Sequence, residues 1–336
     1  MLKGAIIGTG FWSRFQLAAW KELEGVEITA LCNRTTSKAE ALAEEFKIAK
    51  VYTSAQELLT GEALDFVDII TDVDTHALLT RLAAEHYVDV ICQKPMASTL
   101  NDARCMLDIC RQQKVKLFIH ENFRWQVPIR ALKESLESGI IGRPFKARVS
   151  FCSAFPVFEN QPFLKDLDHF ILTDIGSHIL DVCRYLFGEA KSLYCITQRV
   201  NKDIKGEDVA NVLMLMESGL HCFAEMSYAS MLEKEAFPQT LILIEGEKGS
   251  VKLGHDFEIK ITTVQGTNRR VIQPKLYDWV DPAYAVAHSS IVDCCRDILS
   301  GLQGGRAETT GEDNFRTVQL LWAAYASAET GKTISF

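Results

Sequence analysis

Short apolar strands alternate with helical patterns along the first third of the chain, and this alternation constrains the fold more than any other feature. The helical patterns cover residues 11–23, 37–46, 75–86 and 99–113. The strands around them are KGAIIG (3–8), VEITALC (26–32), FVDIIT (66–71), DVICQ (89–93) and KLFIH (116–120). Near-continuous apolar strands separated by helices are typical of a parallel sheet covered on both faces. The sequence therefore predicts an α/β, doubly wound domain over residues 1–122.

After residue 122 the pattern changes. Helices are expected over 128–138 and 173–187, and KARVSFCS (146–153) alternates apolar and polar residues as a half-buried strand does. Two helices, near 285–300 and 312–329, close the chain. Between them and the earlier helices lie the strand patterns KSLYCITQRV, VANVLMLME, LHCFAEMSY, QTLILIEGEKGSVKL and FEIKITTV. This order predicts a second, α+β domain over residues 123–336 with a large, mainly antiparallel open sheet.

Composition and charge exclude several classes of function. The 336-residue chain has a formal net charge of −8 and lacks a lysine- or arginine-rich run, so nucleic-acid binding is not expected. It lacks an apolar run near the roughly 20 residues that cross a bilayer, and its N-terminus enters a strand without a signal-peptide cleavage pattern. Ten cysteines, none in a CxxC pair, suit buried thiols in a reducing cytosol. We expect a soluble, cytoplasmic protein without a membrane partner.

The first strand ends in the turn GTGFWS, directly before the first predicted helix. Gly8 permits a tight turn, and Gly10 lets a pyrophosphate approach the helix N-terminus. The third position of the pattern is Ser13, which is small enough for close packing of helix and strand. Because the turn lies inside a strand–helix–strand pattern, it predicts a dinucleotide site of the Rossmann type that includes Phe11 and Trp12. A glycine turn without a ligand is the alternative.

The position that contacts the adenosine ribose falls at Asn33-Arg34-Thr35. A carboxylate here would bind the 2′-hydroxyl of NAD and repel the 2′-phosphate of NADP. Asn33 carries no charge, and Arg34 can pair with a phosphate or stack on the adenine. The sequence is therefore compatible with NAD or NADP as the cofactor, and Arg34 can also be interpreted as a solvated loop residue.

Polar residues also follow the later strands of the predicted parallel sheet. The segment 71–76 follows FVDIIT, the segment 93–95 ends DVICQ, and the segment 120–125 ends KLFIH. Proline fixes its own φ and restricts the residue before it, so Pro95 should hold Lys94 in an extended conformation. Ligands bind at the carboxyl ends of strands in doubly wound folds. Lys94 is therefore predicted to lie at a ligand site.

Asp174 and His178 stand four residues apart on the predicted helix 173–187, so they share one face, which Asp181 continues. Oxidation of a carbinol needs a base for the hydroxyl proton, which a histidine can supply near neutral pH. It also needs positive charge near the developing alkoxide, which Lys94 can supply. Taken singly, Asp174 can be a helix-start carboxylate and His178 a core histidine. Together with Lys94 they indicate hydride transfer.

With these motifs in place, the chain resembles the Gfo/Idh/MocA family of NAD(P)-dependent oxidoreductases, which act mainly on sugars, polyols and their derivatives. The resemblance spans essentially the whole chain and rests on GTGFWS, ITDVDTH, QKPMA, DIGSHILD and the tail TTGEDNFRTVQLLWAAYASAETGK. It implies Lys94, Asp174 and His178 as catalytic residues. It also implies a homodimer or homotetramer formed through the open face of the second-domain sheet. The implied cofactor contacts are Gly8, Gly10, Phe11, Trp12, Asn33, Arg34, Thr71, His76, Gln93 and Lys94.

The chain departs from the family pattern at two places. Gln93 stands where the family has the glutamate of its Glu-Lys-Pro motif, a change that should leave the lysine in place. Asp72 and Val73 stand where the family often has prolines, which leaves the cofactor contacts of that loop open.

Substrate choice is predicted to depend on the segment HENFRW and on the irregular loop 155–169. Polar groups beside an aromatic ring suit a polyhydroxylated substrate, because buried hydroxyls need partners. Trp125 also suits a core position. HENFRW and AFPVFENQPFL resemble sugar 1-dehydrogenases of the apiose type, so we expect oxidation of a sugar or polyol, at the anomeric carbon to a lactone or at a ring carbinol to a ketone. The predicted substrate-binding residues are Lys94, Glu121, Asn122, Arg124, Trp125, Asp174 and His178.

Two other classes of protein remain open from the sequence. A metal-dependent hydrolase or lyase could use His120, Glu121, Asp174 and His178, although the chain lacks an HExxH motif or a comparable ligand spacing, and we predict no metal site. A regulator that binds a nicotinamide without turnover would keep the glycine turn, but it would not need both Lys94 and His178.

Overall fold

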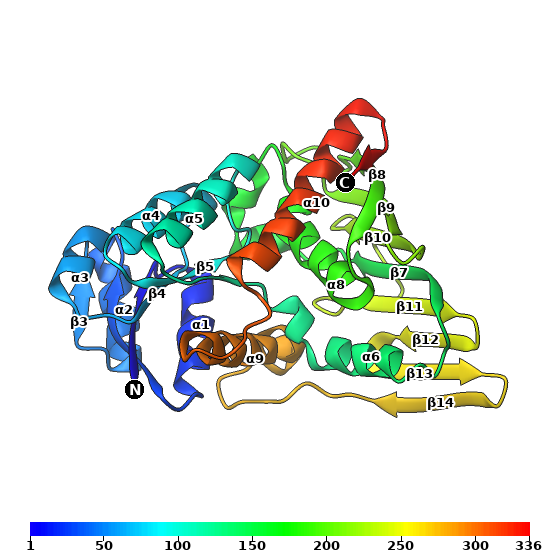
Figure 1. Cartoon of the computed structure of the whole chain (residues 1–336), viewed down its shortest axis with the longest axis horizontal. Coiled ribbons are helices and arrows are strands. Elements are labelled where there is room, and N and C mark those ends of the chain that lie inside the picture. Colours follow the sequence, from blue (N-terminus) through cyan, green and yellow to red (C-terminus); the bar gives the residue numbers. More distant parts are fainter. The chain divides into compact units, whose positions relative to one another are not determined.

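The structure is a computed structural model that describes residues 1–336, apart from the side chain of Asn160. The chain divides into two compact units. The first comprises Met1–Asn122 and Ile291–Val318, and the second comprises Phe123–Ser290 and Gln319–Phe336. One unit contains a parallel sheet and the other a large mixed sheet, as the sequence predicts (Figure 1).

The parallel sheet of the first unit has the strand order β3-β2-β1-β4-β5-β6. This is the order of a dinucleotide-binding Rossmann fold, in which ligands bind where the order reverses, here between β1 and β4. The central strands are apolar and buried, with Ile6, Ile69 and Ile91 wholly inaccessible. The strands are β1 (Leu2–Ile7), β2 (Val26–Cys32), β3 (Lys50–Tyr52), β4 (Phe66–Ile69), β5 (Asp89–Gln93) and β6 (Leu117–His120).

Helices connect these strands, and α4 packs beside α5. Two elements, β3 and α3, are absent from the sequence-based prediction, because a strand of three residues and a helix of seven are too short to show a clear period. The helices are α1 (Phe11–Lys21), α2 (Thr36–Phe46), α3 (Ala55–Gly61), α4 (His76–Glu85) and α5 (Leu100–Gln113), with a 3₁₀ turn at Val73–Thr75 before α4.

The segment Ile291–Val318 belongs to the first unit, whereas the predicted boundary assigned it to the second domain. It contains most of α9 (Ala285–Leu302) and the start of α10 (Gly311–Thr330). Lys116 Nζ donates hydrogen bonds to the carbonyls of Gly301 and Leu302 at 2.9 and 2.8 Å. The backbone N–H of Ile119, on β6, donates to the carbonyl of Thr309 at 2.9 Å. The segment therefore pairs with β6, through contacts between residues that are far apart in the sequence.

The sheet of the second unit has the order β14-β13-β12-β11-β7-β10-β9-β8-β15 (Figure 1). Neighbouring strands are antiparallel except for β7 and β10, which run parallel. The strands are β7 (Pro144–Cys152), β8 (Ala190–Gln198), β9 (Val209–Met216), β10 (His221–Ser227), β11 (Leu241–Gly246), β12 (Gly249–Leu253), β13 (Glu258–Thr263), β14 (Gly266–Val271) and β15 (Ile334–Ser335).

One face of this sheet packs on helices. Alternate residues such as Val149, Met214 and Ile244 are buried against α6 (Val127–Glu137) and α8 (Ser177–Phe187). The opposite face carries exposed apolar side chains, among them Ile196 and Leu213. The period-two pattern of the strands therefore reports a sheet with one buried and one open face.

The segment between β7 and α8 contains several short turns. The loop 155–169, expected to be irregular, contains the short helix α7 (Val157–Asn160) and a 3₁₀ turn at Pro162–Asp166, since proline suits the first position of a helical turn. A π-helical turn, Leu172–Gly176, runs directly into α8. Further 3₁₀ turns lie at Phe123–Trp125, His255–Phe257 and Pro282–Tyr284. Among the helices of the described residues, none is both long and apolar enough to cross a membrane.

Candidate functional site

The glycine turn lies between β1 and α1, at the point where the order of the parallel sheet reverses. Gly8 has φ +105°, and a β carbon there would stand 2.2 Å from the carbonyl oxygen of Ile70, so only glycine fits. At Gly10 a β carbon would meet nothing within 4 Å, which leaves open space at the N-terminus of α1. Thr9 Oγ1 is buried and has no hydrogen-bond partner among the described residues. The turn thus combines space, helix N–H groups and a spare hydroxyl, which suits a phosphate.

Aromatic side chains surround the start of α1. Phe11 is 48% exposed, and its ring meets Trp12 edge-on at 5.2 Å and Phe15 at 5.3 Å. An exposed aromatic cluster beside a phosphate-binding turn offers an apolar surface to a flat ligand.

The predicted ribose position is tied to the glycine turn by Asn33. The backbone N–H of Thr9 donates to Asn33 Oδ1 at 3.4 Å, and Asn33 Nδ2 donates to the carbonyl of Thr35 at 3.0 Å. Arg34 is exposed. The loop therefore presents an exposed cation and an amide, with no carboxylate at the position that would exclude a 2′-phosphate.

Lys94 lies on the loop after β5, and polar contacts hold this loop on both sides. The backbone N–H of Lys94 donates to Gln93 Oε1 at 2.9 Å. His76 is buried with Nδ1 3.1 Å from the carbonyl oxygen of Pro95 and Nε2 3.2 Å from that of Thr71. Burial lowers the pKa of His76. His76 thus links the loop after β4 to the loop that carries Lys94, and the Lys94–Pro95 peptide bond is cis.

The end of β6 carries buried polar residues. Glu121 is wholly inaccessible and Asn122 is 9% exposed. His120, also buried, has Nε2 3.5 Å from the thiol of Cys295, and the thiol of Cys294 donates to the carbonyl of Glu121 at 3.7 Å. Contacts with α9 therefore fix the end of β6, next to the predicted substrate residues Glu121 and Asn122.

Asp174 and His178 lie where the π-helical turn passes into α8. π-Turns are rare and occur frequently at functional sites. The His178 ring is buried and stacks on Phe123, with centroids 3.9 Å apart and planes 8° apart. The Tyr228 hydroxyl donates to Asp174 Oδ2 at 3.2 Å. Burial, and next the nearby Asp174 charge, raise the pKa of Tyr228, so this phenol remains a neutral donor.

Arg124 and Trp125 occupy a 3₁₀ turn in the second unit, and the structure gives Arg124 a strong partner there. Arg124 Nε and Nη2 donate to the two oxygens of Asp181 at 2.7 and 2.6 Å, in a buried bidentate pair. Asp181 therefore engages two of the three guanidinium nitrogens of Arg124, and a contact of Arg124 with substrate stays a prediction. The indole N–H of Trp125 is buried without a hydrogen-bond partner among the described residues, and the Arg130 guanidinium lies 4.4 Å from the centre of the Trp125 ring.

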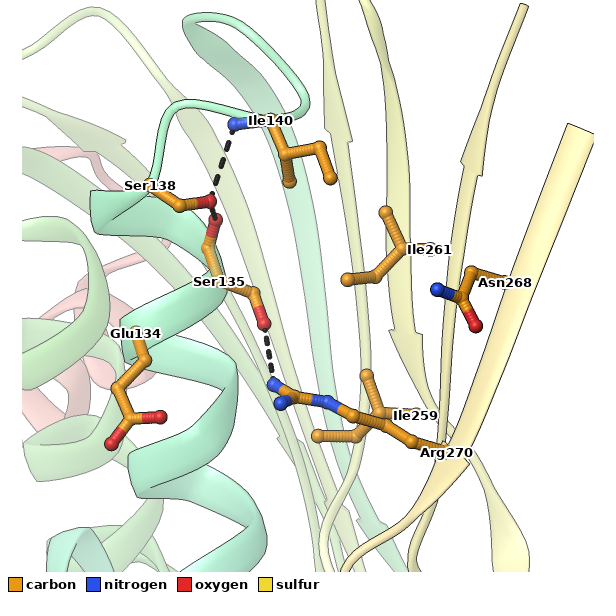
Figure 2. Close-up of a pocket in the computed structure, with 8 residues that line it drawn as sticks. All are labelled: Glu134, Ser135, Ser138, Ile140, Ile259, Ile261, Asn268 and Arg270. Atoms are coloured by element: carbon orange, nitrogen blue, oxygen red, sulfur yellow. Dashed lines mark hydrogen bonds between the residues drawn. The ribbon is translucent and has the colours of Figure 1, made fainter. Parts of the chain in front are cut away.

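A separate groove of about 260 Å³ lies between α6 and the β13–β14 hairpin (Figure 2). Ile140, Ile259 and Ile261 form its apolar wall. Arg270, on β14, reaches across to α6, where its Nη2 donates to Ser135 Oγ at 2.9 Å (Figure 2). The groove contains none of the residues predicted for catalysis or cofactor binding, so it is not part of the candidate site.

The predicted residues thus fall into two groups. The first unit brings the glycine turn, the ribose loop and the loop of Lys94 to one edge of the parallel sheet. The second unit brings Asp174 and His178 together on one helix. Three residues that the sequence did not single out also contact the predicted groups: Gln16, Phe123 and Tyr228. Gln16 in turn donates to Asp68. Among the described residues, no group of three or more His, Cys, Asp and Glu side chains is arranged to hold a metal ion.

Comparison with known proteins agrees with this geometry. Residues 2–121 match the oxidoreductase family with an NAD-binding Rossmann fold, and residues 129–252 match the GFO/IDH/MocA C-terminal domain. A D-apiose dehydrogenase of Paraburkholderia graminis is 43% identical over 99% of this chain and 89% of that protein. Another D-apiose dehydrogenase, from Rhizobium rhizogenes, is 40% identical over 99% of this chain and 97% of that protein.

A solved structure is similar over the same length. It is an oxidoreductase from Agrobacterium radiobacter in complex with NAD⁺, L-tartaric acid and magnesium, 40% identical, with a TM-score of 0.97 over 99% of this chain and 98% of that chain.

The fold and the glycine turn define an NAD-dependent oxidoreductase, which confirms the predicted class of enzyme. The chain belongs to the Gfo/Idh/MocA family. Its residues fit NAD, since the turn leaves open space at Gly10 and an unpartnered buried hydroxyl at Thr9 among the described residues. Gly8, Gly10 and the first-turn N–H groups of α1 would hold the pyrophosphate, and the Asn33 loop would hold the ribose.

Proposed function

We propose that this enzyme oxidises a sugar at its anomeric carbon to the lactone, with D-apiose or a related sugar as the substrate. The observation that carries the proposal is the end-to-end similarity to two D-apiose dehydrogenases, at 43% and 40% identity. Lys94 and His178 supply the two kinds of chemistry that oxidation of a carbinol requires. A ring carbinol oxidised to a ketone is the alternative within the same class.

His178 takes the role of the base in this reaction. It accepts the proton of the hydroxyl group while the carbon–oxygen double bond forms, and a histidine titrates in the range that this task needs. Its ring is restrained by the parallel stack on Phe123, which limits rotation of the imidazole. Asp174, fixed by the Tyr228 hydroxyl, favours the imidazolium that results.

Lys94 stabilises the negative charge that develops on the substrate oxygen. Its main chain is held by Gln93 and by the contacts of His76 with the neighbouring loop. NAD, when bound, supplies the hydride acceptor. The unpartnered indole N–H of Trp125 is a donor for a further sugar hydroxyl, and Glu121 and Asn122 remain proposed substrate contacts.

The test is the absorbance of reduced nicotinamide, followed with purified enzyme, NAD or NADP, and a panel of D-apiose, other aldoses, inositols and sugar acids. We expect turnover with D-apiose or a close relative, and a lactone as the product. Turnover only with inositols would place the oxidation at a ring carbinol. Tight binding of NAD without turnover of any sugar would favour the nicotinamide-binding regulator instead.

The same assay measures cofactor choice. NAD is the expected cofactor, and the uncharged Asn33 together with the exposed Arg34 leaves room for a 2′-phosphate. We therefore expect measurable activity with NADP. A replacement of Asn33 by Asp should reduce activity with NADP far more than activity with NAD.

We also infer that the enzyme forms a homodimer or homotetramer through the open face of its second sheet. Tyr194 and Leu213 are paired across β8 and β9, and with Ile196 they expose apolar surface on this face. Exposed apolar surface of this kind marks interaction sites. Light scattering on Leu213→Glu should then give a smaller particle than the wild type.

We place the reaction in the cytoplasm. Among the described residues, which include all ten cysteines, each cysteine is a free thiol and most are buried. Free thiols persist in a reducing compartment.

A further inference from the structure

A chain of hydrogen bonds links a buried carboxylate to the backbone of Lys94, entirely within the first unit. Asp68, on β4, is wholly inaccessible and accepts hydrogen bonds from Gln16 Nε2 at 2.8 and 2.7 Å and from Trp20 Nε1 at 2.8 Å. Gln93 Nε2 donates to Gln16 Oε1 at 2.9 Å, and the N–H of Lys94 donates to Gln93 Oε1 at 2.9 Å. The path thus runs from β4 through α1 to the end of β5.

Above the pKa of Asp68 this path has a direction, because an ionised carboxylate can only accept hydrogen bonds. Asp68 attracts the Nε2 group of Gln16, so Gln16 presents its Oε1 to Gln93. Gln93 must then present its own Nε2 to Gln16, which leaves its Oε1 for the N–H of Lys94. A side-chain amide alone can turn either way with little change of shape. The carboxylate therefore sets the orientation of both amides.

We propose that Asp68, Gln16 and Gln93 form a hydrogen-bond relay whose direction positions Lys94 for the reaction. Asp68 and Gln16 are positioning residues, since they act on Lys94 only through Gln93. The inference rests on the proposed function, in which Lys94 acts on the substrate oxygen.

The relay also explains the glutamine at position 93, where the family motif has a glutamate. A glutamate at this position would direct a carboxylate oxygen at Gln16 Oε1, so two acceptors would face each other. Gln16 cannot turn to relieve the conflict while its Nε2 group is bound to Asp68. The side chains at positions 16, 68 and 93 must therefore be compatible with one another in donor and acceptor order.

The direction of the relay can be reversed by two substitutions. In Asp68→Asn, Trp20 Nε1 still requires an oxygen at position 68, so the new amide nitrogen faces Gln16. Gln16 then turns, and presents its Nε2 to position 93. A glutamate there can accept from Gln16 with one oxygen and from the N–H of Lys94 with the other. The double variant D68N/Q93E therefore satisfies the bonds that each single variant breaks, at unchanged net charge.

The experiment measures kcat at pH 8.5, above the Asp68 pKa of about 7, and at saturating NAD and sugar. The full-length wild type, Q93E, D68N and D68N/Q93E are compared. Each single variant should lose about 10- to 100-fold in kcat, because a small misplacement of a reacting group has an effect of this size. The double variant should return to within about threefold of the wild type, as expected for residues coupled through one network. The Kd for NAD is measured for each variant, so that kcat is compared at saturation even where a change at Gln93 weakens NAD binding.

A double variant as slow as the product of the two single effects would overturn the relay, and so would single variants with the turnover of the wild type. The matched control is D108N/Q112E, an exchange of the same two side-chain types four residues apart on the exposed side of α5, which should leave kcat unchanged.

Urea unfolding of the same four proteins, without substrate, tests whether the hydrogen bonds of the relay form, independently of their effect on Lys94. The two substitutions should lower the unfolding midpoint less together than the sum of their separate effects. Coupled stability with uncoupled kcat would mean that the hydrogen bonds exist but do not position Lys94, which overturns the proposal. Normal turnover of Lys94→Ala would instead refute the proposed function of Lys94, whatever the relay variants do.

Discussion

Lys94 and His178 are held by different kinds of structure. Lys94 lies on a loop whose main chain is fixed by directional hydrogen bonds, from Gln93 on one side and from His76 on the other. His178 lies inside the helical segment of the second unit, where its ring stacks on Phe123 and the next turn carries the buried pair of Asp181 with Arg124. Loss of a directional contact should change the rate, whereas loss of packing or of a buried ion pair should also change stability.

The largest effect is expected from removal of the two proposed catalytic groups. Lys94→Ala and His178→Ala should each reduce kcat by about 10²–10⁴-fold, the usual contribution of a positioned acid, base or charge. The Kd for NAD should change little, because the glycine turn that binds the pyrophosphate is separate from both side chains. Stopped-flow turnover and fluorescence titration of NAD measure the two quantities.

Lys332→Ala and His255→Ala are the controls for this pair. Both residues are far in the chain from the candidate site, Lys332 exposed after α10 and His255 before β13. They should retain wild-type turnover. A His178→Ala variant with normal kcat would show that His178 is not the base.

Removal of the Arg124 side chain should have its largest effect on stability. Arg124→Ala leaves the fully buried Asp181 without its bidentate partner, and breaking a buried pair from one side costs about 3–5 kcal/mol of unfolding free energy. Urea unfolding of the cofactor-free protein measures the loss. The control is Arg143→Ala, because the exposed pair of Arg143 with Glu247 should contribute only about 0–1 kcal/mol.

This substitution also separates two roles of Arg124. If the side chain bound substrate, as we predicted from the sequence, KM would rise while the urea midpoint stayed near that of the wild type. The structure leads us to expect the reverse. Replacement of both partners, Arg124→Met with Asp181→Leu, should recover most of the stability, since an apolar pair of similar volume needs no ionic partner.

Asp68 should make the stability of the first unit depend on pH. Burial raises the pKa of Asp68 from 3.8 to about 7, so the folded state binds a proton that the unfolded state has released. The stabilisation is complete below the unfolded pKa and is lost as the pH rises through about 7. Between pH 6 and 8 the wild type should lose roughly 1 kcal/mol relative to Asp68→Asn, which does not titrate.

Urea unfolding of both proteins at several pH values measures this difference in unfolding free energy. The contributions of other titrating groups are the same in both proteins and cancel in the difference. The nearby thiols of Cys92 and Cys295 have raised pKa values because of burial, so they remain neutral in this range. A constant difference between the two proteins from pH 6 to 8 would show that Asp68 keeps its ordinary pKa in the folded state.

The sequence predicted the parts of the site that depend on local patterns. The turn at Gly8 and Gly10, Lys94 before a proline, and the pair Asp174 and His178 are all defined by residues within one or two turns of each other. Their elements formed as expected, with β1 before α1 and the helix that carries His178. A short spacing on a strand end or on a helix face is enough to place such residues.

The parts that the sequence did not predict depend on contacts between distant residues. Gln16 and Asp68 are 52 positions apart, and Tyr228 is 54 positions from Asp174. The packing of residues 291–318 beside β6 also depends on contacts between residues far apart in the sequence. The pairing of Arg124 with Asp181 likewise spans 57 positions, and no periodicity in the sequence indicates it.

The smallest predicted effect concerns the stack on His178. Phe123→Leu keeps an apolar side chain but removes the flat ring that lies 3.9 Å from the imidazole. We expect kcat to fall about 3- to 10-fold, in line with the energy of an aromatic pair, while KM changes little because the ring acts on His178. The control is Phe145→Leu on β7, since Phe145 is 48% exposed and lies outside the loops predicted for substrate choice. A change in KM alone would indicate that Phe123 contacts the sugar directly, and the second unit would then present an aromatic surface to the substrate.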